Sequence, residues 1–291
     1  MRPQTPARVG VLGASSPVGA CLLAQLADDG WDVTAFSRQN RETSCDGVTW
    51  RKLPDVFPQD AEALRYWICI APIWVLPDYF ELLEAYGAQR VVALSSTSCF
   101  GKSDSSDPEE RAVASRLADA EFRVRAWAES RGVAWVVLRP TLVYGLGRDK
   151  NISEIARFIS RFGFFPVFGR AGGLRQPVHV ADVASACLAA LQSSRAANRA
   201  YNISGGETLA YRDMVARIFT GLELRPRLLT VPLWSFRLAV TMLRCLPRYR
   251  QWSAAMAERM NRDLVFDHAE AKRDLGFNPQ VFELADGDLP T

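Results

Sequence analysis

Residues 7–30, ARVGVLGASSPVGACLLAQLADDG, decide the fold of this chain. The segment ARVGVLGA (7–14) is a short apolar, β-branched run that ends in alanine after glycine, which is typical of a buried strand. From Ser16 onward the apolar side chains recur at helical spacing. Ser16 suits the N-cap, Pro17 suits the first helical turn, and Gly30 suits the helix end. The stretch therefore predicts a strand, a glycine-bearing turn and a helix.

The same alternation continues through the first half of the chain. Further predicted strands and helices follow one another, with strands at 31–38, 66–71, 90–96 and 133–140 and helices at 77–87 and 110–121. This order is typical of parallel βαβ units, whose right-handed crossovers place helices on both faces of a sheet. We expect an α/β fold, namely a Rossmann doubly wound parallel sheet with a small C-terminal α/β substrate lobe.

The second half is less regular and sets the expected domain limits. Its predicted elements are helices at 151–161 and 181–194, a glycine-bearing turn and strand at 168–180, and a strand, turn and helix over 200–219. No internal repeat, low-complexity tract or long linker separates the two halves. We therefore expect a Rossmann domain over 1–165, to which 174–204 returns, and an interleaved substrate-binding lobe over 166–291.

Composition narrows the function classes. The chain has 291 residues, 48% hydrophobic and 23% charged, which is ordinary for a globular protein with a full-sized core. A net charge of +3 is too small to indicate nucleic-acid binding. The cysteines are scattered without C-x-x-C spacing, so we expect no metal site and a reducing, cytoplasmic location. No signal peptide is evident, and no segment reaches about 18 consecutive apolar residues.

The turn GASSPVG (13–19) between the first strand and helix stands where dinucleotide-binding folds hold a pyrophosphate on free backbone N–H groups. Ser16 takes the place of a middle glycine, and Pro17 removes one N–H donor, so a plain βα turn is the alternative interpretation. We expect cofactor contacts from five residues of the turn, Gly13, Ser15, Ser16, Val18 and Gly19.

The second predicted strand ends in Ser37 and Arg38. An acidic residue at this point would bind the ribose hydroxyls of the adenosine, whereas a Ser-Arg pair suits a 2′-phosphate. The pair favours NADP as the cofactor, with NAD kept open, and the alternative for Arg38 is a solvated surface arginine.

Seven motifs follow one another along the chain: GASSPVG (13–19), CIAPIW (69–74), VVALSSTSCFG (91–101), LRPTLVYGLGRDKN (138–151), GLRQPVHVADVA (173–184), YNISGGE (201–207) and FDHAEAKRDLGFNP (266–279). In these motifs the chain resembles the extended short-chain dehydrogenase/reductase superfamily, in its nucleotide-sugar epimerase and dehydratase branch. The resemblance implies a phosphorylated or nucleotide-linked small-molecule substrate. It also implies further cofactor contacts at Ala71, Ser95 and Pro140.

The catalytic Tyr and Lys of that superfamily have no counterpart here. The superfamily spaces them Y-x-x-x-K on a long helix, where the Lys lowers the pKa of the Tyr so that the phenolate can exchange a proton during hydride transfer. Glu121 fits a Glu that usually follows the Lys by four residues. Counting back places Leu117 at the Lys position and Val113 at the Tyr position. The window from 95 to 132 contains no Tyr, and its one Lys is Lys102.

Two residues are the candidate catalytic groups. Ser96 matches the catalytic Ser or Thr of the superfamily by its distance from Phe100-Gly101, and Lys102 is the visible acid/base candidate. The alternative for Ser96 is a strand-end serine that bonds the backbone. His179 matches a structural histidine that follows the substrate loop in the superfamily.

The substrate-binding candidates are Thr141, Arg175 and Arg244. Thr141 follows the strand that borders the nicotinamide end. Arg175 matches an arginine that contacts the substrate diphosphate in UDP-galactose epimerases, since a guanidinium suits phosphate oxygens. Arg244 belongs to a basic cluster that suits a diphosphate or an anionic surface. A surface arginine in a turn is the alternative for Arg175.

Residues 231–252, VPLWSFRLAVTMLRCLPRYRQW, combine large apolar side chains with arginines as their only charges. A basic amphipathic helix can lie on a membrane surface, whereas the alternative is a substrate-lobe helix packed on the sheet. The resemblance also implies a homodimer formed through the helix that contains 110–121.

Three hypotheses on function remain open at this point. The first is an NAD(P)-dependent oxidoreductase or epimerase with replaced acid/base residues. The second is a catalytically inactive protein that senses NADP(H) or stabilises a complex, as an accessory subunit of respiratory complex I does in this superfamily. The third is a membrane-surface enzyme of lipid-linked glycan assembly.

Overall fold

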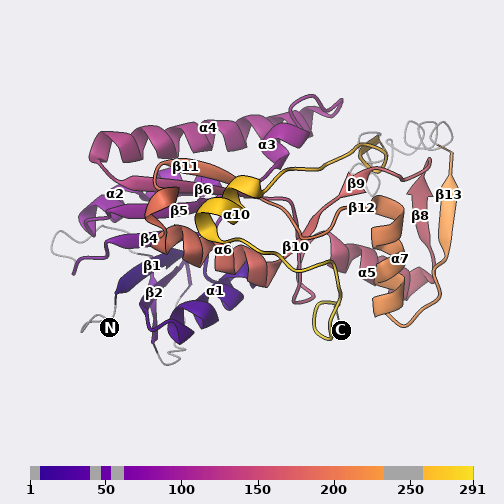
Figure 1. Cartoon of the computed structure of the whole chain (residues 1–291), viewed down its shortest axis with the longest axis horizontal. Coiled ribbons are helices and arrows are strands. Elements are labelled where there is room, and N and C mark those ends of the chain that lie inside the picture. Colours follow the sequence, from indigo (N-terminus) through magenta and orange to yellow (C-terminus); the bar gives the residue numbers. More distant parts are fainter. Residues whose placement is uncertain (1–6, 40–46, 54–61, 233–257, 291) are drawn as a thin grey trace.

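The computed structural model describes residues 7–39, 47–53, 62–232 and 258–290. Within them, seven strands form one parallel sheet in the order β11-β6-β5-β4-β1-β2-β3 (Figure 1). Their bounds are β1 Arg8–Leu12, β2 Asp32–Ser37, β3 Val48–Lys52, β4 Tyr66–Cys69, β5 Arg90–Leu94, β6 Ala134–Pro140 and β11 Arg199–Ile203. The chain adds β2 and β3 on one side of β1 and then β4 on the other, so the order reverses between β1 and β4. Doubly wound sheets bind ligands at such a switch point.

Helices cover both faces of this sheet, as predicted. On one face lie α1 (Pro17–Asp28) and α6 (Val180–Gln192), which pack against each other. On the other lie η1 (Ile73–Tyr79), α2 (Phe80–Ala85) and α4 (Pro108–Arg131) (Figure 1). Successive strand residues alternate between the two apolar cores that result, because a strand turns its side chains to opposite faces.

Two local features differ from the sequence prediction. Strand β3 was not predicted, because Thr49, Arg51 and Lys52 are exposed on this edge strand and give no apolar run. The helix expected over 77–87 begins earlier, as the 3-10 segment η1, and only α2 is α-helical. Pro77 lies inside η1 and lacks the N–H that an α-helical bond would need.

A second, smaller group of elements lies at one end of the long axis of the molecule (Figure 1). It packs α5 (Ile152–Phe162) and α7 (Tyr211–Gly221) with the parallel pair β8 (Phe165–Phe168) and β13 (Leu228–Val231) around a third apolar core. The remaining short elements are α3 Ser98–Gly101, β7 Leu142–Tyr144, β9 Leu174–Arg175, β10 Pro177–His179, η2 Ser194–Ala196, β12 Leu209–Ala210 and α10 Ala269–Leu275. The domain limits expected from the sequence stay a prediction.

None of the helices in the described part of the chain is long and apolar enough to cross a bilayer.

Candidate dinucleotide and substrate site

The turn between β1 and α1 is built so tightly that glycine is required at two positions. Gly13 has a φ of +82°, and a Cβ there would lie 2.4 Å from the backbone nitrogen of Ala71, just beyond β4. A Cβ on Gly19 would lie 2.2 Å from the carbonyl oxygen of Ala14. The turn, the start of α1 and the end of β4 therefore meet backbone to backbone at the switch point of the sheet.

The start of α1 presents donors toward solvent. Ser16 caps the helix, and its hydroxyl accepts the N–H of Gly19 at 3.1 Å. The N–H of Val18 lies in the first turn, where no helical carbonyl can accept it. Ser15 is exposed, and the Ser16 hydroxyl keeps its own proton for donation. A pyrophosphate fits this arrangement, because the donors are backbone and hydroxyl groups at the positive end of a helix.

The end of β2 presents a cation beside this turn. Ser37 pairs in register with Lys52 of β3, and its hydroxyl accepts the N–H of Gln39 at 3.2 Å. Arg38 is exposed and forms no ion pair within the described residues. The predicted dinucleotide residues at the ends of β1, β2 and β4 are thus brought to one edge of the sheet, while their contacts with a cofactor stay a prediction.

Glu121 anchors α4 to the ends of β5 and β6. Its carboxylate accepts both Nε of Arg139, at 3.0 and 3.1 Å to the two oxygens, and the hydroxyl of Ser95 at 2.5 Å. The side chains of Glu121 and Arg139 are only 13% and 22% exposed. The guanidinium of Arg139 also lies over the ring of Phe100, 4.9 Å from its centroid. These contacts fix the position of α4 along its axis relative to the candidate Ser95.

With α4 held there, its catalytic positions are occupied by apolar side chains. Leu117 is 3% exposed and belongs to the apolar core on the α4 face of the sheet. Val113, one turn earlier, packs against the same core. Neither residue carries a group that can move a proton, so this wall of the site offers no phenol and no amine at the two positions that the resemblance assigns to catalysis.

The hydroxyl of the candidate Ser96 forms a hydrogen bond with the backbone. Its hydroxyl accepts the N–H of Ser98 at 3.1 Å, at the start of α3. The neighbouring Thr97 donates its hydroxyl to the carbonyl of Pro140 at 3.2 Å, which brings the candidate Pro140 beside the end of β5.

The candidate Lys102 closes α3 as its C-cap. Burial, and then the positive charge of Arg259, lower the pKa of Lys102, while Asp107 acts in the opposite direction. Within the described residues no hydrogen bond joins Lys102 to Ser96. The structure thus brings Ser95 and Pro140 together near Glu121, and it does not link the two candidate catalytic residues.

Arg175 has a structural role that the sequence did not reveal. The side chain is buried, and its guanidinium donates to the carbonyls of Leu174 at 2.7 Å, Arg262 at 2.8 Å and Arg259. Burial lowers the pKa of this guanidinium, with the side chain lying over the ring of Tyr211. Arg175 thereby holds residues 259–262 in place, and a substrate phosphate would have to share these donors.

Of the other two substrate candidates, Thr141 lies within the described residues and Arg244 does not. Thr141 follows β6 and donates its hydroxyl to the carbonyl of Gln176 at 2.5 Å, while its N–H bonds to Ile203 at 3.0 Å. Arg244, together with most of the predicted membrane-facing segment 231–252, lies outside the described residues.

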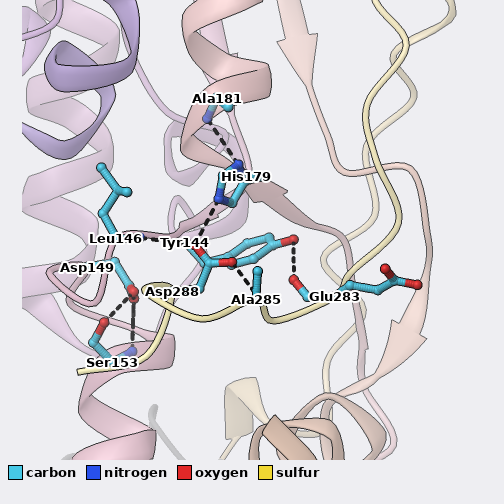
Figure 2. Close-up of polar contacts among 9 residues, drawn as sticks. All are labelled: Tyr144, Leu146, Asp149, Ser153, His179, Ala181, Glu283, Ala285 and Asp288. Carbon is cyan, nitrogen blue, oxygen red and sulfur yellow. Dashed lines mark hydrogen bonds and ion pairs between the residues drawn. The ribbon is translucent and has the colours of Figure 1, made fainter. Parts of the chain in front are cut away.

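His179 is fixed by both of its ring nitrogens (Figure 2). Nδ1 accepts the N–H of Ala181 at 3.2 Å and so caps α6, which places the ring proton on Nε2. Nε2 lies 3.1 Å from Oδ1 of Asp288, which also accepts the N–H of Leu146, and Oδ2 of the same carboxylate accepts the N–H of Ala285. His179 therefore joins β10, α6 and the C-terminal segment, and no ring nitrogen is left for a substrate.

Tyr144 lies beside this histidine, and its hydroxyl is likewise occupied by a hydrogen bond to the protein. The ring is fully buried, and its hydroxyl donates to the carbonyl of Glu283 at 3.2 Å (Figure 2). Burial is the main cause that raises the pKa of Tyr144. This Tyr is consequently no replacement for the phenolate that is missing from α4.

A charged contact between distant segments was not visible in the sequence. The loop before α4 and its first turn pair with residues 258–262, through Asp104 with Arg262 at 2.8 Å, and Glu110 with Arg259. The partners lie 149 and 158 residues apart, and each looks like an ordinary surface charge in the sequence. Arg259 of this contact also influences Lys102, because its positive charge lowers the pKa of that lysine.

The described geometry agrees with comparisons to known proteins. Residues 78–204 match the model of the NAD dependent epimerase/dehydratase family. The UDP-glucose 4-epimerase of Vibrio cholerae is 23% identical over 203 residues, which cover 66% of this chain and 59% of that protein. A mitochondrial NADH dehydrogenase 1 alpha subcomplex subunit 9 of Arabidopsis thaliana is 26% identical over 150 residues, which cover 51% of this chain and 35% of that protein.

A solved structure extends the likeness over the fold. The structure of MoeE5 in complex with UDP-glucose and NAD superposes with a TM-score of 0.67 at 22% identity, covering 94% of both chains. The doubly wound parallel sheet with a glycine turn at its switch point defines the class of Rossmann-fold dinucleotide-binding proteins. Within this class the chain is similar to the NAD-dependent epimerase/dehydratase family, whose model matches residues 78–204.

Proposed function

We propose that this protein binds a nicotinamide dinucleotide, NADP in preference to NAD, together with a nucleotide-linked ligand, and works without the Tyr-Lys proton relay of its family. Its function in this proposal is to sense NADP(H) or to stabilise a complex. The observation that carries the proposal is the position of Leu117, buried in the core on a helix that Glu121 and Arg139 hold in register. Apolar side chains at the positions of Val113 and Leu117 supply no proton.

The chain has a defined set of groups for the cofactor. The N–H of Val18 and the hydroxyls of Ser15 and Ser16 would bind the pyrophosphate, and Arg38 would pair with a 2′-phosphate. Ala71 and Pro140 would border the rest of the dinucleotide. A bound nicotinamide supplies hydride transfer, and the residues named here bind and orient it.

The names of the relatives support both parts of the proposal. The solved relative MoeE5 holds UDP-glucose and NAD, which favours a nucleotide-linked ligand for this chain as well. The plant relative is named as a subunit of NADH dehydrogenase, which is the type of role that an inactive family member would have in a complex. On the ligand side we assign Thr141 and Arg175 to the site, with Arg244 as the candidate from the basic cluster.

A second candidate is an oxidoreductase or epimerase whose proton comes from Lys102. The lowered pKa of Lys102 favours it, because a lysine must lose its charge to act as a base. Ser96 accepts the N–H of Ser98 and would assist with its own hydroxyl proton, which this bond leaves available. This candidate predicts hydride turnover that disappears in Lys102→Ala.

Calorimetry and turnover separate the two candidates. We expect NADP(H) to bind the full chain and Arg38→Ala to lose affinity for NADP(H) by roughly tenfold while NAD(H) binding changes little. Gly172→Ala is the matched control, since a Cβ at Gly172 would meet no atom within 4 Å. Failure of both dinucleotides to bind at millimolar concentration would overturn the proposal. Hydride turnover on a panel of UDP-sugars that is lost in Lys102→Ala would favour the enzyme instead.

Self-association through α4 is a separate proposal that follows from the resemblance. Light scattering of the full chain tests it, with a monomer as the outcome that contradicts it.

A further inference from the structure

Aromatic rings gather on the surface where α5 ends and β8 begins. Phe162 is 51% exposed and Phe164 is 36% exposed, although both are large apolar side chains. Phe158 joins them, with its ring centroid 4.6 Å from that of Phe162 and 5.9 Å from that of Phe164. Exposed aromatic rings in mutual contact are unusual on a surface that faces only water.

The strand β13 extends this apolar surface. Phe164, Arg227, Leu228 and Leu229 line a shallow groove of about 340 Å³, and Leu229 is 54% exposed. The N–H of Phe165 donates to the carbonyl of Arg227 at 3.0 Å, which holds the two segments together. We call Phe158, Phe162, Phe164 and Leu229 the aromatic patch.

Three arginines lie around the aromatic patch, while Glu154 on α5 and Glu223 before β13 are the acidic residues nearest to it in the sequence. Arg161 lies over the ring of Phe162, 5.3 Å from its centroid, and Arg225 and Arg227 are exposed beside β13. None of the three forms an ion pair within the described residues, whereas the exposed Arg125 and Arg217 elsewhere each have a carboxylate partner. Three guanidinium groups that have no ion pair in the described part of the chain therefore lie beside an exposed apolar surface.

The amino-acid sequence continues this charge pattern beyond β13. Residues 224–257 contain six arginines and no Asp or Glu, and Glu223 and Glu258 are the acidic residues on either side. The positive charge is therefore concentrated in the stretch that begins at β13.

We propose that the aromatic patch and its arginines dock on a membrane surface that contains anionic lipid. Aromatic rings favour the interface between headgroups and acyl chains, and guanidinium groups pair with lipid phosphates. Basic residues near an anionic leaflet each strengthen the attraction. The patch lies on α5, β8 and β13, which are at one end of the long axis (Figure 1).

The charge pattern favours lipid phosphate as the occupant. An excess of arginine around exposed rings matches a surface that is negative everywhere, as an anionic bilayer is. The docking does not depend on the cofactor or on turnover, and it would hold the protein at a membrane whichever candidate function applies.

Vesicle flotation of the full chain tests the docking. One set of vesicles contains phosphatidylcholine alone, and the other contains phosphatidylcholine with phosphatidylglycerol. We expect the protein to float with the anionic vesicles, to bind the neutral ones far less, and to dissociate as salt is raised. Arg161→Gln/Arg227→Gln should weaken anionic binding by roughly twenty- to thirtyfold. Phe162→Ser/Phe164→Ser should weaken it by at least about tenfold.

The matched control is Phe122→Ser/Arg123→Gln on α4, because Phe122 is 70% exposed and Arg123 is exposed. This variant should float like the unchanged protein. Circular dichroism, light scattering and NADP(H) calorimetry establish that each variant keeps its fold, oligomeric state and cofactor site. The proposal is overturned if the unchanged protein does not float with anionic vesicles, if neutral vesicles bind it equally well, or if the patch variants bind like the control.

Discussion

Glu121 of α4 and Arg139 at the end of β6 form a largely buried ion pair, with Nε of Arg139 at 3.0 and 3.1 Å from the two carboxylate oxygens. The pair ties a helix to a strand at the edge of the sheet where the candidate site lies. It determines which side chains of α4 face the core and which face solvent. The pair holds Leu117 on the core side of α4, and because residues 95–132 contain no Tyr, no register of this helix could supply the Tyr-Lys relay.

Arg139→Met should lower the free energy of unfolding by about 3 kcal/mol, because it leaves the Glu121 carboxylate largely buried without its cation. Urea unfolding measures this change. Arg125→Met is the control, since the Arg125–Glu129 pair is 60% and 49% exposed and should contribute about 0.3–0.5 kcal/mol. Equal losses in the two variants would contradict the anchoring role of Glu121 and Arg139.

Leu117→Ala should cost about 2–4 kcal/mol of stability, as expected for a leucine that is 3% exposed in a packed core. Val113→Ala should cost less, because Val113 is only partly buried. Thermal and urea unfolding measure both, with the exposed Arg123→Ala as a variant that should change little. A loss below about 1 kcal/mol for Leu117→Ala would mean that this side chain lines an open site instead of the core.

The first half of the fold was predictable because each element carries its own local pattern. The run before Gly13 and the cap and proline at the start of α1 were sufficient for the first βα unit, and repetition of such units gives the parallel sheet. Strand β3 was missed because it lies at the sheet edge with exposed polar side chains, so burial left no periodic pattern in its sequence.

Gly19→Ala should weaken NADP(H) binding by roughly tenfold or more. It should also lower the free energy of unfolding by about 1–3 kcal/mol. A Cβ there would lie 2.2 Å from the carbonyl oxygen of Ala14, so the start of α1 would have to move away from β1. Calorimetry and urea unfolding measure the two effects. Gly172→Ala, which adds a Cβ in open space, should leave both unchanged.

Lys102→Met should alter how stability depends on pH. Burial lowers the pKa of Lys102 in the folded protein below its ordinary 10.5, so between these two values the unfolded state binds more protons at this residue. The contribution of Lys102 to stability therefore rises with pH across that window. Urea unfolding from pH about 7 to about 10 measures the free energy of unfolding of both proteins. The value for the unchanged protein should increase relative to that for the variant as pH rises. A constant difference would contradict the lowered pKa.

The site was predictable in its parts but not in its contacts. Residues of the glycine turn and the strand ends could be assigned because a parallel sheet brings strand ends to one edge. The pairs Glu121–Arg139 and His179–Asp288 could not, since their members lie 18 and 109 residues apart and a single sequence carries no record of such pairing. Arg175 was expected to be available to a phosphate, yet its donors hold backbone carbonyls, which no local pattern indicates.

The burial of Leu117 also limits the evolutionary routes open to this chain. A Lys at that position without the matching Tyr would place a charge in an apolar core and cost stability before it could contribute to catalysis. A Tyr at Val113 alone would lack the cation that makes it a useful proton carrier. Regaining the relay thus requires two substitutions whose single steps are each disadvantageous, so selection that acts one mutation at a time would preserve the present state.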